Sequence, residues 1–217
     1  MKQIVTIHIT GDDALEFLQG QLTNDLERLE SEAEILSAWC SPKGRVIWFD
    51  AVAKTAAGYA LTAPAETAEE IVKRLAVYRF RAKVDFTIAD EGDAVDAESL
   101  IAAGRAYIGT EQIEQFTPHM LNLDILDAIS LDKGCYTGQE IVARTHYKGA
   151  TKRRTLRFTS SETVVAGDKI SDGKRDIGEV LNAAGQQLLA VIAVDKQHDP
   201  LAVGTATLQP AELPYSL

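Results

Sequence analysis

Cysteine is scarce in this chain: Cys40 and Cys135 are the only two among its 217 residues. Two cysteines cannot build the disulfide framework of a small secreted protein, so we expect free thiols in a reducing compartment. They also fall short of the four thiolates that hold most iron–sulfur clusters. Zinc sites need clustered cysteine and histidine ligands, and the four histidines lack such a spacing. The sequence therefore predicts no metal site.

Long apolar runs and an excess of positive charge are also missing. The longest apolar stretches, such as 188–194, are far too short to span a bilayer, and the N-terminal segment has no apolar core of signal-peptide length. The net charge at pH 7 is −10, which argues against nucleic acid as a direct ligand. A chain of this length can bury the core of one large domain or of two small ones. We expect a cytoplasmic protein without direct membrane contact.

Strand and helix patterns alternate over the first ninety residues. Apolar and polar residues alternate over 3–10, the pattern of a half-buried strand. Segments 35–40 and 45–53 predict a hairpin, because Pro and Gly in the turn between them suit its backbone angles. Three further elements are a strand at 59–62, an amphipathic helix at 65–78 and a strand at 84–89. Together they indicate an α+β region built like a ferredoxin-type split unit.

A short helix is expected directly after the first strand. Asp12 or Asp13 can cap it, with Leu15 and Leu18 facing inward. Gly20 is expected to end it, because glycine can adopt the left-handed conformation that closes many helices.

The stretch Lys-Gly-Cys-Tyr-Thr-Gly-Gln-Glu, which begins at Lys133, combines turn residues, a thiol and a helix start. Thr137 and Glu140 have the spacing of a capping box, so a helix is expected to begin near Gly138. Cys135 would then lie just before a helix N-terminus and close to the Lys133 ammonium, and both features favour thiolate. The alternative is a buried structural cysteine in a tight glycine turn.

Cations gather just after this stretch, where no acidic residue lies between Glu140 and Glu162. Six of them stand there: Arg144, Lys148, Lys152, Arg153, Arg154 and Arg157. One interpretation is a solvated loop and strand edge, since Lys and Arg mostly face water. The other is an anion dock for a polyglutamate tail, a phosphate or an RNA backbone, because Arg captures such groups with paired hydrogen bonds.

The pattern changes again from residue 153 onward, to short strands separated by glycine turns. The expected strands are 155–159, 164–170, 177–181, 187–194 and 205–208. Even spacing of this kind is typical of a small closed barrel. The chain is therefore expected to divide near Ala150 into regions 1–150 and 151–217.

The eight residues from Lys133 to Glu140 resemble the signature of the YgfZ family, which lies within the folate-binding superfamily typified by the glycine-cleavage aminomethyltransferase. Shorter matches occur at 19–25, 43–45, 116–118, 122–123 and 213–216. The resemblance covers nearly the whole chain. It implies an α+β fold, with a GcvT-like N-terminal α/β region of shortened middle segment and a small C-terminal antiparallel β-barrel.

The resemblance also implies a function. Members of this kind would bind tetrahydrofolate, with or without a polyglutamate tail, and support assembly or repair of iron–sulfur enzymes, including those that modify tRNA. Cys135 would be the essential thiol, assisted by Lys133, and the partners would be iron–sulfur client or assembly proteins. Ten polar or aromatic side chains would contact the folate: Gln19, Gln21, Thr23, Asn24, Trp48, Tyr136, Gln139, Glu140, Arg144 and Arg153.

Two alternatives to this accessory role stay open. The first is a tetrahydrofolate-dependent aminomethyltransferase that carries out one-carbon transfer. The second is an interaction scaffold that binds no folate.

Overall fold

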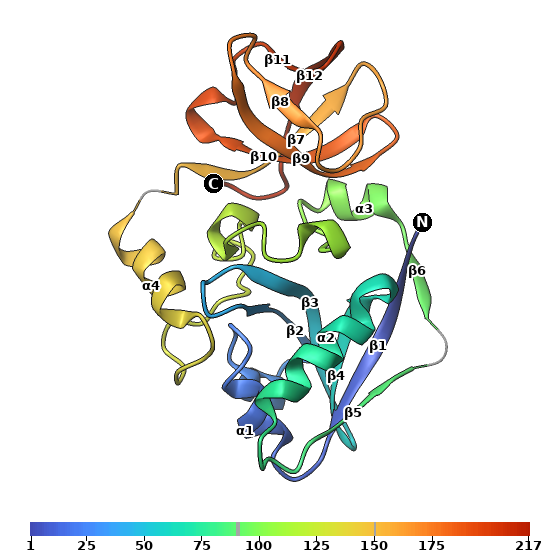
Figure 1. The fold of residues 1–217 in the computed structure, drawn as a ribbon, viewed down its shortest axis with the longest axis vertical. Coiled ribbons are helices and arrows are strands. Elements are labelled where there is room, and N and C mark those ends of the chain that lie inside the picture. Colours follow the sequence, from blue (N-terminus) through green and yellow to red (C-terminus); the bar gives the residue numbers. More distant parts are fainter. Residues whose placement is uncertain (90–91, 150) are drawn as a thin grey trace.

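The computed structural model describes residues 1–89, 92–149 and 151–217, so the expected domain boundary at Ala150 lies outside the described residues. An N-terminal α/β region and a C-terminal β-barrel are stacked along the long axis of the molecule (Figure 1). The α+β fold class predicted from the sequence is confirmed. Among the helices of the described residues, none combines the length and the apolar character needed to cross a membrane.

The N-terminal sheet has the strand order β2-β3-β4-β1-β5, and β6 pairs with the start of β1. Its strands are β1 (Lys2–Thr10), β2 (Glu34–Cys40), β3 (Val46–Thr55), β4 (Gly58–Pro64), β5 (Asp85–Ile88) and β6 (Asp93–Val95). All of these pairings are antiparallel. The first strand and the hairpin that the sequence predicted are both confirmed, because local alternation and turn chemistry determine them.

Four α-helices and four short 3-10 helices accompany the strands in the described residues. The α-helices are α1 (Ala14–Gln19), α2 (Ala65–Tyr78), α3 (Ala97–Ala102) and α4 (Gln139–Lys148). The 3-10 helices are η1 (Leu26–Glu30), η2 (Thr110–Gln112), η3 (Pro118–Leu121) and η4 (Val194–Lys196). The bounds of α2 are those predicted from its apolar spacing.

The sheet separates two apolar cores. On one face, α1 and α2 pack against the strands through side chains such as Ile7, Ile9, Trp48, Ile71 and Leu75. On the other face, the segment after α3 and strand β10 of the barrel meet the sheet through side chains such as Phe49, Leu121, Val142, Leu189 and Val191. Burial of each such side chain contributes about 1.5–3 kcal/mol. The barrel is therefore joined to the sheet by a continuous core.

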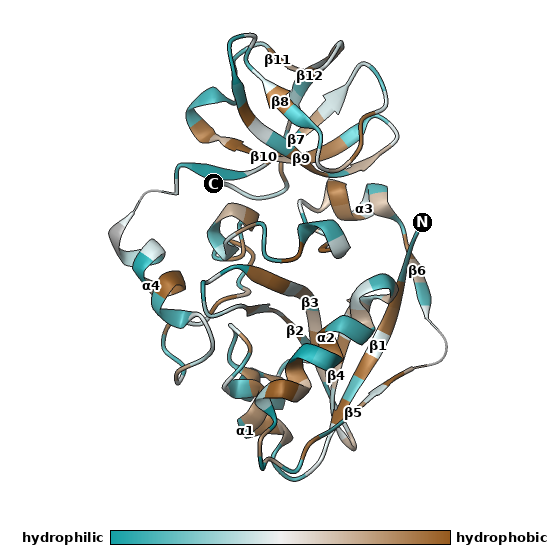
Figure 2. Cartoon of the chain, viewed as in Figure 1, coloured by the Kyte–Doolittle hydropathy of each residue, from teal (hydrophilic) through white to brown (hydrophobic). Residues whose placement is uncertain are grey.

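The C-terminal barrel closes in the order β10-β7-β12-β11-β8-β9. Its strands are β7 (Arg153–Ser160), β8 (Lys169–Ser171), β9 (Asp176–Ala184), β10 (Gln187–Ala193), β11 (Leu201–Val203) and β12 (Ala206–Ala211). Alternate residues of β10 face the barrel interior and the N-terminal region, which explains its unbroken apolar run. Apolar residues concentrate accordingly on these strands and on the central sheet (Figure 2). The strand expected at 164–170 forms only at its end, because Val165 is exposed and Gly167 has a φ of +90°.

Two predictions at α1 are wrong, and a third is right only in part. Leu15 is exposed, whereas Leu18 is buried as expected. The Asp13 carboxylate accepts a hydrogen bond from the backbone amide of Lys83 at 2.8 Å and does not cap the helix. Gly20 ends the helix as expected, but its φ of −77° lies in the right-handed region. The chain continues turning there, and the amide of Leu22 bonds to the Leu18 carbonyl.

Candidate functional site

The loop that carries the sequence signature is fixed to the N-terminal region by Lys133. Its Nζ atom donates three hydrogen bonds to backbone carbonyls of the 19–24 segment, at 2.9 Å to Gln19, 2.8 Å to Leu22 and 2.9 Å to Asn24. The same ammonium lies 5.4 Å from the centroid of the Tyr136 ring. Two segments more than one hundred residues apart in sequence are thereby joined at a single charged group.

Burial lowers the pKa of this lysine. Desolvation is the main cause that lowers the pKa of Lys133 to about 8, and the nearby Asp25 carboxylate opposes the shift. The sequence predicted that the ammonium acts on the Cys135 thiol. In the fold it is directed at the carbonyls of the 19–24 segment instead.

The two cysteines occupy opposite environments. Cys135 is exposed in the loop before α4, so the alternative of a buried structural cysteine is wrong. Cys40 is fully buried at the end of β2, and desolvation raises the pKa of its thiol to about 12. Thiolate is the reactive form of cysteine, so Cys40 is inert near neutral pH. Cys135 is the thiol that a partner or substrate can reach.

Helix α4 begins where the sequence predicted, but without a capping box. The Thr137 hydroxyl donates to the Gln21 side-chain oxygen at 3.0 Å, and Glu140 forms an ion pair with Arg144 at 2.5 Å. Gly138 precedes the helix with a φ of +83°. A Cβ atom there would lie 2.5 Å from the carbonyl oxygen of Ser41, so only glycine fits. The signature thus packs backbone to backbone against the turn of the β2–β3 hairpin.

Three of the polar side chains predicted to contact folate hold the 19–25 loop in place instead. The Thr23 hydroxyl donates to the Ala128 carbonyl at 2.7 Å and accepts from the Ala38 amide at 2.9 Å. The Asn24 side-chain amide donates to the carbonyls of Leu36 and Asp127. Gln19 bonds to the Asp25 carboxylate at 2.7 Å and to the Leu26 amide at 3.1 Å. These hydrogen bonds already occupy the side-chain groups through which the three residues would pair with a pterin edge.

The predicted aromatic contacts are also part of the core. Trp48 is 1% exposed and its indole N–H donates to the Thr62 carbonyl at 2.8 Å, so it offers no face to a ligand. Tyr136 is buried, and desolvation raises the pKa of its hydroxyl above the ordinary value. Gln139 is half-buried at the start of α4.

Three of the cations after the signature, Arg144, Arg153 and Arg154, have separate partners in the described part of the chain. Arg144 lies on the surface of α4 and pairs with Glu140. Arg153 is half-buried on β7 and donates to the Val191 carbonyl at 3.1 Å. Arg154, the next residue, binds the Asp124 carboxylate through two hydrogen bonds of 2.9 and 2.8 Å. The anion-dock interpretation is wrong for Arg154, whose side chain serves the contact between the barrel and the N-terminal region.

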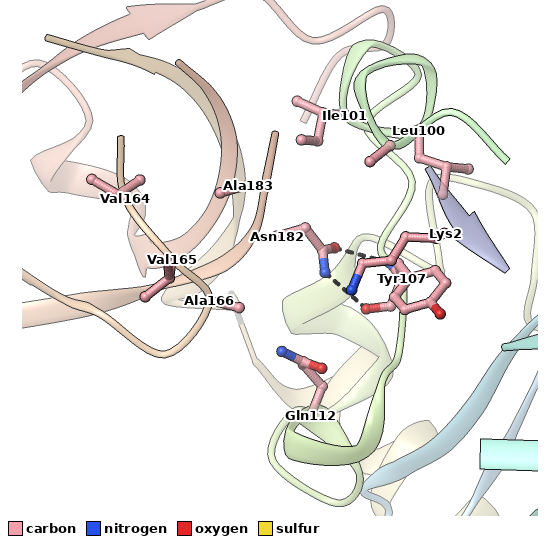
Figure 3. Close-up of a pocket in the computed structure, with 11 residues that line it drawn as sticks. Lys2, Leu100, Ile101, Tyr107, Gln112, Val164, Val165, Ala166, Asn182 and Ala183 are labelled. Carbon is pink, nitrogen blue, oxygen red and sulfur yellow. Dashed lines mark hydrogen bonds between the residues drawn. The ribbon is translucent and has the colours of Figure 1, made fainter. Parts of the chain in front are cut away.

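A pocket of about 180 Å³ lies at this contact between the two regions (Figure 3). Its walls are mostly apolar and come from the start of β1, from α3 and the segment that follows it, and from the barrel. Four of the lining residues have polar groups in their side chains: Lys2, Tyr107, Gln112 and Asn182. Lys2 lies 4.9 Å from the centroid of the Tyr107 ring, and Asn182 fixes the backbone of Tyr107 with two hydrogen bonds of 2.9 Å. No sequence pattern indicates this pocket, because its walls are distant along the chain.

The fold also brings together His119, Asp124 and His146, whose ligating atoms lie within 4.8 Å of one another. The spacing of the histidines along the sequence predicted no such cluster. Their proximity depends on the packing of η3 against α4, which no local pattern predicts.

Comparison with known proteins confirms the resemblance and the fold. The chain is 27% identical to the tRNA-modifying protein YgfZ of Vibrio atlanticus over 97% of this chain and 90% of that protein. It is 28% identical to the protein of that name from Klebsiella pneumoniae over 96% of this chain and 90% of the relative. No protein-family model matches the chain. The alignment to the Vibrio protein spans 289 positions, so that relative carries segments absent from these 217 residues.

Among solved structures, the aminomethyltransferase T of the glycine cleavage system from Bartonella henselae superposes with a TM-score of 0.78. The match covers 97% of this chain and 83% of the aminomethyltransferase, at 13% sequence identity. It confirms the GcvT-like fold.

Proposed function

We propose that this chain is a cytoplasmic folate-binding accessory protein that supports assembly or repair of iron–sulfur enzymes, including those that modify tRNA, with Cys135 as its essential thiol. The observation that carries the proposal is an exposed thiol within a signature loop that hydrogen bonds join to the 19–24 segment. Similarity to proteins named tRNA-modifying protein YgfZ over nearly the whole chain supports the same role.

The hydrogen bonds on both sides of Cys135 suit a thiol that must meet a partner protein. Lys133 and Thr137, on either side of Cys135, are both hydrogen-bonded to the 19–24 segment. A Cβ atom added at Gly134 would meet no neighbouring atom within 4 Å, so the loop is open on the side next to the cysteine. A thiol displayed in this way can approach an iron–sulfur client or assembly protein without rearrangement of the fold.

We propose that the folate ring binds in the pocket between the two regions. The apolar walls can contact a flat heterocycle, and the side-chain oxygen of Gln112 can accept a hydrogen bond from its polar edge. At about 180 Å³ the pocket is smaller than the roughly 300–1,000 Å³ of sites that enclose a drug-sized ligand. It therefore suits the ring alone, with the glutamate end outside.

Tetrahydrofolate binding by the purified protein tests this assignment. Calorimetry is expected to show that the wild type and Cys135→Ser bind tetrahydrofolate equally, because Cys135 is not part of the pocket wall. Ala166→Trp should weaken binding about tenfold or more by filling the pocket from its loop. Thr163→Trp places the same ring at an exposed position of the same loop and should leave the affinity unchanged.

Two results would oppose the folate assignment. No binding by the wild type would favour the folate-free scaffold. Equal affinity of Ala166→Trp and the wild type would place folate outside this pocket.

A further inference from the structure

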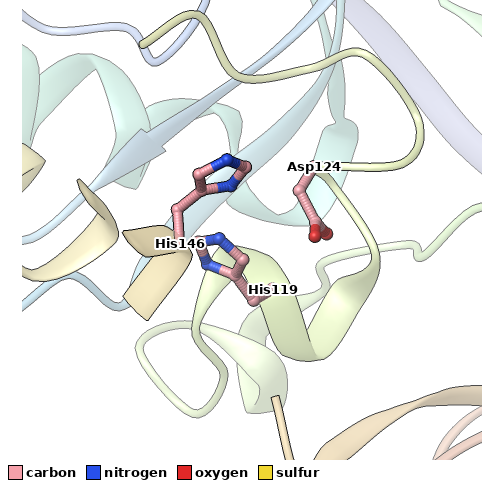
Figure 4. A group of neighbouring side chains, drawn as sticks. All are labelled: His119, Asp124 and His146. Atoms are coloured by element: carbon pink, nitrogen blue, oxygen red, sulfur yellow. The ribbon is translucent and has the colours of Figure 1, made fainter. Parts of the chain in front are cut away.

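Three potential metal ligands from separate segments converge where the N-terminal region meets the barrel (Figure 4). His119 belongs to η3, Asp124 follows that helix, and His146 lies in the second half of α4. One ligating atom of each lies within 4.8 Å of the other two. The two imidazole rings are 5.8 Å apart between centroids and tilted by 47°.

His119 is the anomalous member of this group. It is only 2% exposed, yet neither Nδ1 nor Nε2 has a hydrogen-bond partner within the described part of the chain. Buried polar groups are nearly always hydrogen-bonded, because an unpaired one loses its solvation without replacement. A ring nitrogen of His119 that makes no hydrogen bond has its lone pair available to a ligand. Neutral imidazole is the commonest metal ligand in proteins.

Asp124 is a second potential metal ligand, and Arg154 holds its carboxylate in place. The Asp124 carboxylate accepts hydrogen bonds of 2.9 and 2.8 Å from the Arg154 guanidinium, and the two side chains are 14% and 16% exposed. A carboxylate has about four lone-pair positions, so the two arginine hydrogen bonds leave others open. Arginine would then orient a ligating carboxylate, as outer partners do in many metal sites.

We propose that His119, Asp124 and His146 bind a divalent transition-metal ion. Two imidazoles and one carboxylate suit Zn²⁺ and Fe²⁺, and three protein ligands leave further coordination positions open to water or a substrate. Ligand bonds of about 2.0–2.2 Å require ligating atoms to approach within roughly 3–3.5 Å of one another. His146 is exposed on α4 and can close this distance by a change of rotamer.

Calorimetry with ZnCl₂ tests the proposal on an untagged chain carrying Cys135→Ser, which removes the exposed thiol as a competing ligand. The expected result is one Zn²⁺ per chain. His146→Ala should weaken binding by at least about tenfold, the lower range for loss of even an outer partner. His198→Ala removes an exposed histidine elsewhere on the surface and should leave the affinity unchanged.

A second readout separates lost ligation from lost folding. Co²⁺ bound by these ligands should give visible absorption bands, and His146→Ala should abolish them while its circular dichroism matches the parent chain. Absence of Zn²⁺ binding by the parent would overturn the proposal. Equal affinity of the parent and His146→Ala would also overturn it, as would an equal loss in His198→Ala.

Discussion

Replacement of Lys133 by Met is expected to lower the free energy of unfolding by about 3–5 kcal/mol. The ammonium donates to three backbone carbonyls, and a hydrogen bond from a charged group contributes about 1.5–3 kcal/mol. The total is smaller than three independent bonds, because the half-buried site lets water replace part of the loss. Met keeps the apolar stem, so the change reports mainly the lost donors.

Urea unfolding at pH 7 measures this difference. Lys174→Met is the matched control, since Lys174 is exposed and such substitutions usually shift stability by less than about 0.5 kcal/mol. Equal midpoints for Lys133→Met and Lys174→Met would show that the three hydrogen bonds of Lys133 do not stabilise the fold.

The difference in stability between the wild type and Lys133→Met is expected to depend on pH. The pKa of Lys133 is about 8 in the folded protein, below the value of about 10.4 for a free lysine. Between these values the unfolded chain binds more protons than the folded one, so this group increasingly favours folding as pH rises. The stability advantage of the wild type over Lys133→Met should therefore widen from pH 8 to pH 10. A constant difference would contradict the burial of the ammonium.

Replacement of Arg154 by Met is expected to cost about 3–5 kcal/mol, because it leaves the Asp124 carboxylate buried without its partner. The two side chains are 16% and 14% exposed. Arg154 also donates to the His119 carbonyl and to Asn122, so the change disturbs the contact between barrel and N-terminal region. Thermal or urea unfolding would show the loss.

The double change Arg154→Met with Asp124→Leu serves as the control. Replacing a whole buried ion pair by apolar residues is often neutral, so the double variant should be more stable than Arg154→Met alone. If the free energy of unfolding of Arg154→Met is within about 0.5 kcal/mol of the wild-type value, the ion pair stabilises the fold no more than an exposed salt bridge does.

Elements with strong local patterns could be predicted from the sequence. Helix α2 and the β2–β3 hairpin have the predicted positions, because apolar spacing and turn residues act within a few residues of each other. The start of α4 was also predicted, although for the wrong reason. The spacing of Thr137 and Glu140 suits a capping box, but the Thr137 hydroxyl donates to the Gln21 side chain, which only the folded chain brings beside it.

Side chains whose partners are distant in sequence could not be assigned in advance. Thr23 and Asn24 are polar residues of the kind that lines binding pockets. In the fold, however, their side chains donate hydrogen bonds to backbone carbonyls of the 127–128 segment. In the sequence, Arg154 is part of a basic cluster, but in the fold it forms an ion pair with Asp124. The pocket and the histidine pair have the same origin, since packing between regions creates both.

Restoration of iron–sulfur enzyme activity in cells that lack this protein tests the role of Cys135 most directly. Under oxidants, which attack exposed clusters and thiols, the wild type should restore activity and Cys40→Ser should restore most of it. Cys135→Ser should fail to restore it, although its circular dichroism and expression match the wild type, because the residue is exposed and serine is nearly isosteric. Full restoration by folded Cys135→Ser would contradict the essential thiol.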